Sequence, residues 1–368
     1  MTEPIRRSSL LETFGLTFLA IAALFAADTF LAKTERAETL VEAAHLFAQG
    51  RALMQRGENA KAIDRIKDAI ANARGNRDYR RTLAEAELAA GRTADAESTL
   101  TDLLQSDSTD GRASLIMGRV MVKEARYEEA VSYFHRAIDG RWREDAAGNR
   151  LQVRFELIDL LAKRNSKEEL LAELLPLEEQ APGDLKTRTR IGRLLLLAGS
   201  PTRAADVFRE ILHDAPDNAE AHAGLGEAEF ARGNYRAAQR DSETALRLAP
   251  DDQASRQRLE LCDELLTLDP TIRGLGPGER FQRSLKLVEL ALVDVSQCVS
   301  SNPSQELREL FGRAATALKA PVSAIRQSEV AESHVDLAEQ LWQVRKKECG
   351  SPPATDRPLA LVLTRLSQ

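Results

Sequence analysis

Between residues 43 and 252, apolar side chains recur every three or four positions, in short stretches that Gly and Pro interrupt. This spacing places the apolar residues on one face of an α-helix, which turns once in about 3.6 residues. Ala, Leu, Arg and Glu are abundant, and such residues lose little rotamer freedom in a helix. The pattern therefore predicts an all-helical chain.

The helical stretches repeat with a period of 34 residues. The markers that share this spacing are Ala62, Ala96 and Ala130, followed by Pro182, Pro216 and Pro250. The two blocks of markers are offset by six residues, which we place at 145–150. A period of this length indicates a repeat architecture, in which stacked copies of one unit bury a continuous core.

Each unit is predicted to hold two amphipathic helices, as the stretch 219–252 illustrates. Gly226 supplies a small residue where a neighbouring helix approaches closely. Gly233 permits the tight turn between the two helices. Pro250 ends the unit, because proline cannot continue a helix.

This pattern resembles the tetratricopeptide repeat, whose features are small residues in both helices, a turn glycine and a terminal proline. The six units are 43–76, 77–110, 111–144, 151–184, 185–218 and 219–252, followed by a cap helix at 253–268. The fourth unit departs from the pattern, with Leu170, Leu174 and Leu177 where small residues are usual. The resemblance implies a right-handed superhelix, an α-solenoid spanning 43–270, whose first helices line a concave groove for a protein or peptide partner.

The residue after the small position of each first helix is expected to face this groove. In chain order these residues alternate in charge: Arg51, Glu85, Arg119, Asp159, Arg193 and Glu227. One interpretation, which we favour, is a ladder of ion pairs between neighbouring repeats, each contributing about 0–1 kcal/mol. The other is a mixed-charge groove that selects a partner by its charges.

Apolar candidates for the same groove recur at helical spacing. They are Phe47, Met54, Leu88, Phe155, Leu196 and Phe230. Residues with this spacing are more often core than ligand contacts, so packing is the favoured role for them.

The N-terminal segment carries an uncharged run from Phe14 to Ala27, preceded by Arg6 and Arg7. We predict a transmembrane signal-anchor helix over 10–32, with a cytoplasmic tail at 1–9 and a helical connector at 33–42. The basic N-terminus then favours an inner-membrane location with the bulk of the chain periplasmic or otherwise extracytoplasmic. A cleaved signal peptide and a buried helix of a soluble protein are the alternatives.

The repeat pattern ends before a C-terminal region, 271–368, for which we predict a helical bundle. Helices are expected over about 279–299, 304–319 and 326–347, and the apolar tail is expected to dock back onto the bundle. Cys298 and Cys349 each precede helix breakers, and they are either a disulfide pair or two free thiols. Trp142, near the six-residue offset, either anchors a partner or fills the gap between the two repeat blocks.

Charge and motifs narrow the choice of function. The net charge of −6 disfavours a nucleic-acid partner, which needs a basic surface. The sequence lacks the spacing of a zinc site, a phosphate-binding loop or a nucleophile elbow, so we predict no catalytic residue, metal, cofactor or small-molecule substrate.

The sequence therefore predicts a membrane-tethered scaffold in the cell envelope that binds partner proteins through its groove. An exported, soluble, chaperone-like repeat protein is the alternative, and an enzyme with a site in the C-terminal bundle is a weaker one.

Overall fold

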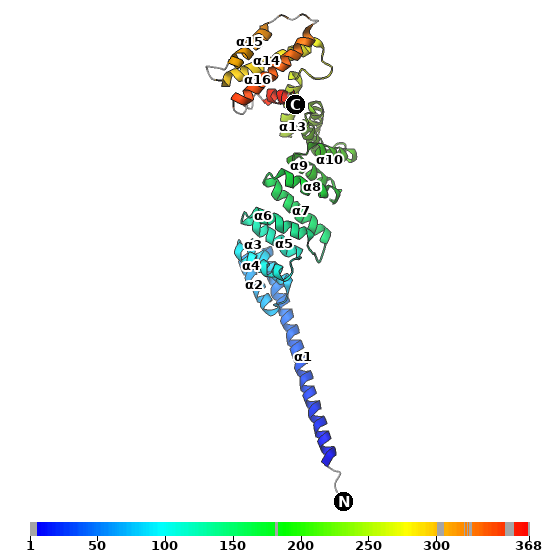
Figure 1. The fold of residues 1–368 in the computed structure, drawn as a ribbon. Coiled ribbons are helices and arrows are strands. Elements are labelled where there is room, and N and C mark those ends of the chain that lie inside the picture. The colour runs from blue at the N-terminus through cyan, green and yellow to red at the C-terminus, as the bar shows by residue number, and fades with distance from the viewer. Residues whose placement is uncertain are drawn as a thin grey trace. The chain divides into compact units, whose positions relative to one another are not determined.

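The computed structural model describes residues 6–180, 183–299, 305–319, 321, 323, 326–349 and 357–366, and these residues are largely helical (Figure 1). The described helices are α1 (Arg6–Gln55), α2 (Asn59–Asn72), α3 (Arg77–Ala89), α4 (Thr93–Ser106), α5 (Gly111–Lys123), α6 (Tyr127–Asp139), α7 (Ala146–Lys163), α8 (Lys167–Gln180), α9 (Leu185–Leu197), α10 (Pro201–Asp214), α11 (Ala219–Ala231), α12 (Tyr235–Leu248), α13 (Gln253–Leu268), α14 (Pro277–Cys298), α15 (Gln305–Lys319), α16 (Gln327–Glu348) and α17 (Arg357–Leu366). Within these ranges, β-pairing is limited to an isolated bridge between Asp110 and Arg141. The all-helical architecture is as predicted.

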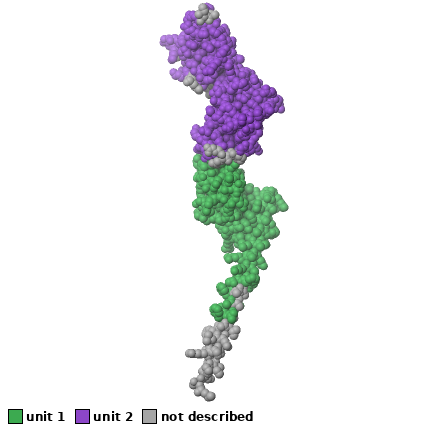
Figure 2. Space-filling view, turned by 90° about the vertical axis from the view of Figure 1, so that its right-hand side faces the viewer, with its two compact units in different colours: residues 1–160 green, residues 161–368 purple. Residues whose placement is uncertain are grey.

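The chain divides into two compact units, which we describe separately (Figure 2). Unit 1 comprises residues 1–160 and holds α1 to α6 with most of α7. Unit 2 comprises residues 161–368 and holds α8 to α17.

Helix α1 corrects the predicted transmembrane segment. Among the described residues, no helix combines the length and the apolar character that crossing a membrane requires. The transmembrane helix predicted over 10–32 was therefore wrong, and the inner-membrane location that depended on it is withdrawn. The uncharged run Phe14–Ala27 has 14 residues, whereas a span needs about 20, and lengthening it required the charged Glu12 and Asp28.

The packed part of unit 1 begins near Ala43, which is fully buried. Before it, nine large apolar side chains of α1, from Phe18 to Val41, are more than half exposed. From Ala43 onward α1 packs on α2, and together they form a helical hairpin like those that follow.

Capping residues explain where the first helices of the repeats begin. Asn76 accepts hydrogen bonds from the backbone N–H groups of Asp78 and Tyr79 at the start of α3. The same N-cap role falls to Asp110, Asp184, Asn218 and Asp252. An N-cap of this kind contributes about 1 kcal/mol, and its recurrence sets the start of the hairpins.

The turns inside the hairpins require a left-handed backbone. Gly57, Gly91, Gly199 and Gly233 adopt φ values between 73° and 77°. Ala125 holds the equivalent place in the third repeat with φ 59°, a conformation that costs an alanine more than a glycine.

Within a hairpin, the small residue of the first helix faces a larger residue 16 positions later. A Cβ added at Gly118 would stand 3.0 Å from the ring of Phe134, and one at Gly192 would stand 2.7 Å from the ring of Phe208. Gly50 with Ile66 and Gly226 with Ser242 repeat the relationship. Small residues are therefore needed here because the two helices cross closely.

Trp142 packs inside unit 1, as the gap-filling interpretation requires. Its indole N–H donates to the carbonyl of Ala137 at 2.9 Å. A Cβ at Gly111 would lie 2.6 Å from the indole nitrogen, so the ring covers the start of α5 closely.

The C-terminal bundle joins α14, α15 and α16 to the end of the repeats. Its core is continuous with Cys262 and Leu265 of α13, and the apolar face of α17 packs into the same cluster, so the tail docks back. Asp294 and Arg345 form a buried ion pair of 2.7 Å between α14 and α16.

Candidate partner-binding surface

The first helices of successive repeats lie next to one another. Helix α3 contacts α5 in unit 1, and α9 contacts α11, which contacts α13, in unit 2. In the described chain, successive second helices, such as α4 and α6, do not form comparable contacts. The first helices are therefore on the inner side of the curved stack, and their outward-facing side chains form its inner face.

In unit 1 the predicted charges bind the next first helix rather than one another. Arg112 of α5 donates from Nε and Nη2 to both carboxylate oxygens of Glu85, at 3.0 and 2.8 Å. Arg119 of α5 donates from Nε and Nη2 to both oxygens of Glu156 of α7, at 2.8 and 2.6 Å. These four side chains form what we call the unit 1 charge row.

The charge row remains ionised and partly accessible. The hydrogen bonds and charge of Glu156 raise the pKa of Arg119 despite burial. Burial opposes charge on Arg112 and on Glu156, but their partners outweigh it, so the pKa of Arg112 is raised and that of Glu156 is lowered. The four side chains are between 27% and 41% exposed, which leaves room for contact with a partner.

In unit 2 the equivalent pairs are looser. Arg193 lies 3.8 Å from Glu220, and both side chains are more than half exposed. Glu227 lies 3.4 Å from Arg258, whose other nitrogen donates to the carbonyl of Ala223. Burial lowers the pKa of Arg258, because these contacts do not fully replace its hydration.

Two of the predicted charges fall outside these pairs. Arg51 is exposed on α1, and Asp159 is half-buried on α7. The structure thus places Glu85 and Arg119 in one row, Arg193 and Glu227 in separate pairs of the other unit, and Arg51 in neither.

The apolar candidates mostly serve packing. Phe47 and Met54 pack against the core of the first hairpin, and Phe47 stacks on Tyr79 with ring centroids 4.2 Å apart. Phe230 packs against the cluster beneath the C-terminal bundle. Leu88, Phe155 and Leu196 are half-buried.

Sequence reasoning missed Arg112 and Glu156, which complete the charge row. Arg112 lies 27 residues after Glu85, which is one repeat less two helical turns, and Glu220 lies 27 residues after Arg193. This spacing was a usable signal. The distance from Arg119 to Glu156 is 37 residues, since the six-residue offset intervenes.

The cysteines are partly described. Cys349 is disulfide-bonded, and Cys262 is a free, buried thiol. The side chain of Cys298 lies outside the described residues, so its pairing with Cys349 stays a prediction. Among the residues that the structure describes, no group of three or more His, Cys, Asp or Glu side chains is placed to hold a metal ion.

Hairpins of two helices, stacked with their first helices inward, define a helical-repeat protein. A family model described as tetratricopeptide repeat matches residues 53–120 and 195–260. The chain therefore contains tetratricopeptide repeats, a class of repeat that mediates protein–protein interaction. Among curated proteins, no significant match to the sequence was found.

Solved structures of repeat proteins are similar at a distance. YrrB, a TPR protein with an unusual peptide-binding site, is 19% identical with a TM-score of 0.43, over 53% of this chain and 97% of YrrB. The C-terminal part of a TPR repeat-containing protein from Cytophaga hutchinsonii is 12% identical with a TM-score of 0.45, over 76% and 98% of the two chains. PilF of Pseudomonas aeruginosa is 16% identical with a TM-score of 0.41, over 61% and 97%. Likenesses of this size carry no argument about function.

Proposed function

We propose that this protein is a non-enzymatic scaffold that holds an extended segment of a partner protein along the unit 1 charge row. The repeats supply a curved, preorganised surface, and the row supplies fixed polar groups on its inner face. Side chains that are already ordered lose less conformational entropy on binding than free ones.

The observation that carries the proposal is the pair of unused donors on α5. Arg112 and Arg119 each use Nε and Nη2 for their carboxylate. Among the described residues, neither Nη1 has an acceptor. Each Nη1 is thus held in place by a bidentate pair while its own N–H groups remain available to a ligand.

The spacing of these donors fits an extended chain. Arg112 and Arg119 are seven residues apart on one helix, which is about 10.5 Å of helical rise. Three residues of an extended polypeptide span about 10 Å. Backbone carbonyls or acidic side chains separated by three residues are therefore the acceptors that this row is expected to bind.

A charge-swap experiment tests the proposal. Peptides that bind the full-length protein would be selected from a random display library, and their affinities measured by fluorescence anisotropy. The test variant combines Glu85→Arg with Arg112→Glu, which keeps the ion pair but removes the donor at position 112. The control combines Arg92→Asp with Asp95→Arg, a swap within an exposed pair at the start of α4, outside the inner face.

We expect the test variant to lose at least tenfold in affinity, and the control to bind like the unmodified protein. Because the ion pair survives the swap, thermal unfolding of both variants should resemble that of the original. Unchanged peptide affinity in a folded Glu85→Arg/Arg112→Glu variant would contradict binding along the charge row.

A further inference from the structure

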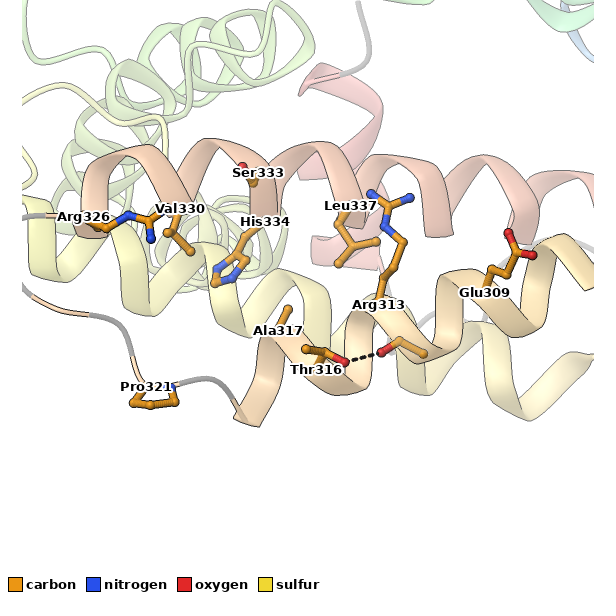
Figure 3. A pocket seen from close by; sticks show the side chains of 11 residues that line it. Glu309, Arg313, Thr316, Ala317, Pro321, Arg326, Val330, Ser333, His334 and Leu337 are labelled. Carbon is orange, nitrogen blue, oxygen red and sulfur yellow. Dashed lines mark hydrogen bonds between the residues drawn. The ribbon is translucent and has the colours of Figure 1, made fainter.

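A cavity of about 780 Å³ opens between α15 and α16 in the C-terminal bundle (Figure 3). Ala317, Val330 and Leu337 give it an apolar lining, and Arg313 and Arg326 also border it. Its volume falls in the range of about 300–1,000 Å³ typical of small-ligand sites. The cavity is separate from the unit 1 charge row and independent of the function proposed above.

His334 is the polar group of interest in this lining. Only 4% of the residue is exposed, and its side chain extends from α16 toward Ala317 of α15 (Figure 3). The ring also lies against Phe281 of α14, with centroids 5.4 Å apart. Burial lowers the pKa of His334, so the imidazole is neutral at neutral pH.

Hydrogen bonding fixes the tautomer of this neutral ring. The hydroxyl of Ser284 donates its single hydrogen to the carbonyl of Phe281 at 2.8 Å. In its contact of 3.3 Å with His334 Nδ1, Ser284 must therefore accept. Nδ1 consequently carries the proton of the ring, and Nε2 carries a lone pair.

The lone pair on Nε2 has no donor. Among the described residues, none forms a hydrogen bond with Nε2. Nor does this atom belong to the fully buried polar atoms that lack a partner, so it has some access to the open space of the cavity. An acceptor in an apolar cavity favours a ligand that brings one donor and otherwise fills the space with apolar surface.

We propose that this cavity binds an aromatic group that carries one hydrogen-bond donor, a phenol or an indole, which donates to Nε2 of His334. Such rings combine a large apolar area with a single polar atom. Arg313 and Arg326 at the border can in addition face the π-electrons of the ring. The group is either a small molecule or the side chain of a Tyr or Trp from a partner.

The test compares ligands with and without the donor. The full-length protein, labelled with ¹⁵N in its histidine rings, would be titrated with p-cresol and with toluene, and with N-acetyltyrosinamide and N-acetylphenylalaninamide. We expect each phenol to bind about tenfold more tightly than its partner without the hydroxyl, as one hydrogen bond can provide. The ¹⁵N resonance of His334 Nε2 should shift with the phenols. Tighter binding of the tyrosine amide than of p-cresol would identify a polypeptide side chain as the ligand, and the reverse would identify a small molecule.

Two variants complete the experiment. His334→Phe keeps a ring in place and removes the acceptor, so it should abolish the preference for phenols while toluene still binds, which shows that the cavity persists. His213→Phe alters an exposed histidine of α10 and should change nothing. Equal affinity of the original protein for p-cresol and toluene, or no binding of either, would overturn the proposal.

Discussion

The ring of Phe208 lies so close to the backbone of Gly192 that a Cβ at residue 192 would stand 2.7 Å from the Cζ atom. The same ring also lies against Gly224 of the next repeat. Phe208 is fully buried and belongs to α10, so one aromatic side chain fills the space between two first helices of unit 2. The small residues of these helices are therefore a steric requirement of the repeat.

Gly192→Ala should accordingly destabilise the protein, although alanine favours a helix. The helix propensity gained is about 1 kcal/mol, whereas forcing an extra methyl group into a close-packed core costs about 1–3 kcal/mol. Gly312→Ala is the matched control, because Gly312 is also helical and a Cβ there would meet open space. Urea unfolding should show a net loss for Gly192→Ala and a gain for Gly312→Ala. A gain at both positions would contradict the steric explanation.

A second prediction concerns Glu87, which is 2% exposed in α3. Burial raises its pKa, and the hydrogen bond from Thr99 at 3.0 Å and the charge of Lys67 only partly oppose this. A carboxyl whose folded pKa exceeds its unfolded value loses stability as the pH rises through the interval between the two values. Glu87→Gln removes this ionisation and keeps an acceptor for Thr99. We therefore expect equal stability of variant and original near pH 4, and greater stability of the variant at pH 7, by chemical denaturation.

Glu229 provides a control of opposite sign. It occupies the same place in α11 as Glu87 does in α3, but it accepts hydrogen bonds from Arg209, Arg232 and Asn234. Removing its charge breaks charge-assisted bonds that are worth about 1.5–3 kcal/mol. Glu229→Gln should therefore destabilise the protein at pH 7. A destabilising effect of Glu87→Gln at pH 7 would show that its charge is satisfied in the folded protein.

The cysteines allow a simple count. Cys349 is disulfide-bonded in the structure, and Cys262 is free. Asp294 and Arg345, which pair between α14 and α16, lie four residues before Cys298 and Cys349 respectively, so both cysteines follow one helical turn later on facing helices. We predict one reactive thiol in the denatured, unreduced protein and three after reduction, by mass spectrometry of the alkylated chain. Three thiols in both samples would rule out the bridge.

Much of the fold was predictable, since the marker residues answer to local physical demands. Gly91 and Gly233 satisfy a left-handed turn, and Gly118 satisfies a close helix crossing, and each demand selects glycine wherever it occurs. The predicted membrane span failed because an apolar run of marginal length was extended across Glu12 and Asp28.

The sites were less predictable, as they depend on pairs of residues brought together by packing. Glu156 reaches Arg119 only because α7 begins after the six-residue offset, which changes the register of the next helix. The tautomer of His334 depends on Ser284, a residue 50 positions earlier on another helix. Periodicity carries no information about such contacts.

The last prediction concerns Leu363 of α17, which is fully buried. Its side chain belongs to the cluster that contains Cys262 of α13, and burial raises the pKa of the Cys262 thiol to about 11. Thiol reagents attack the thiolate, so this cysteine should react slowly while α17 stays docked. Leu363→Ala removes buried apolar surface worth about 2–5 kcal/mol, and we expect it to accelerate labelling of Cys262 by a thiol reagent at pH 8. Thr364→Ala, at an exposed position of the same helix, should leave the rate unchanged. If both variants label at the original rate, α17 does not protect Cys262, and the C-terminal helix contributes less to closing the end of the repeats than its burial implies.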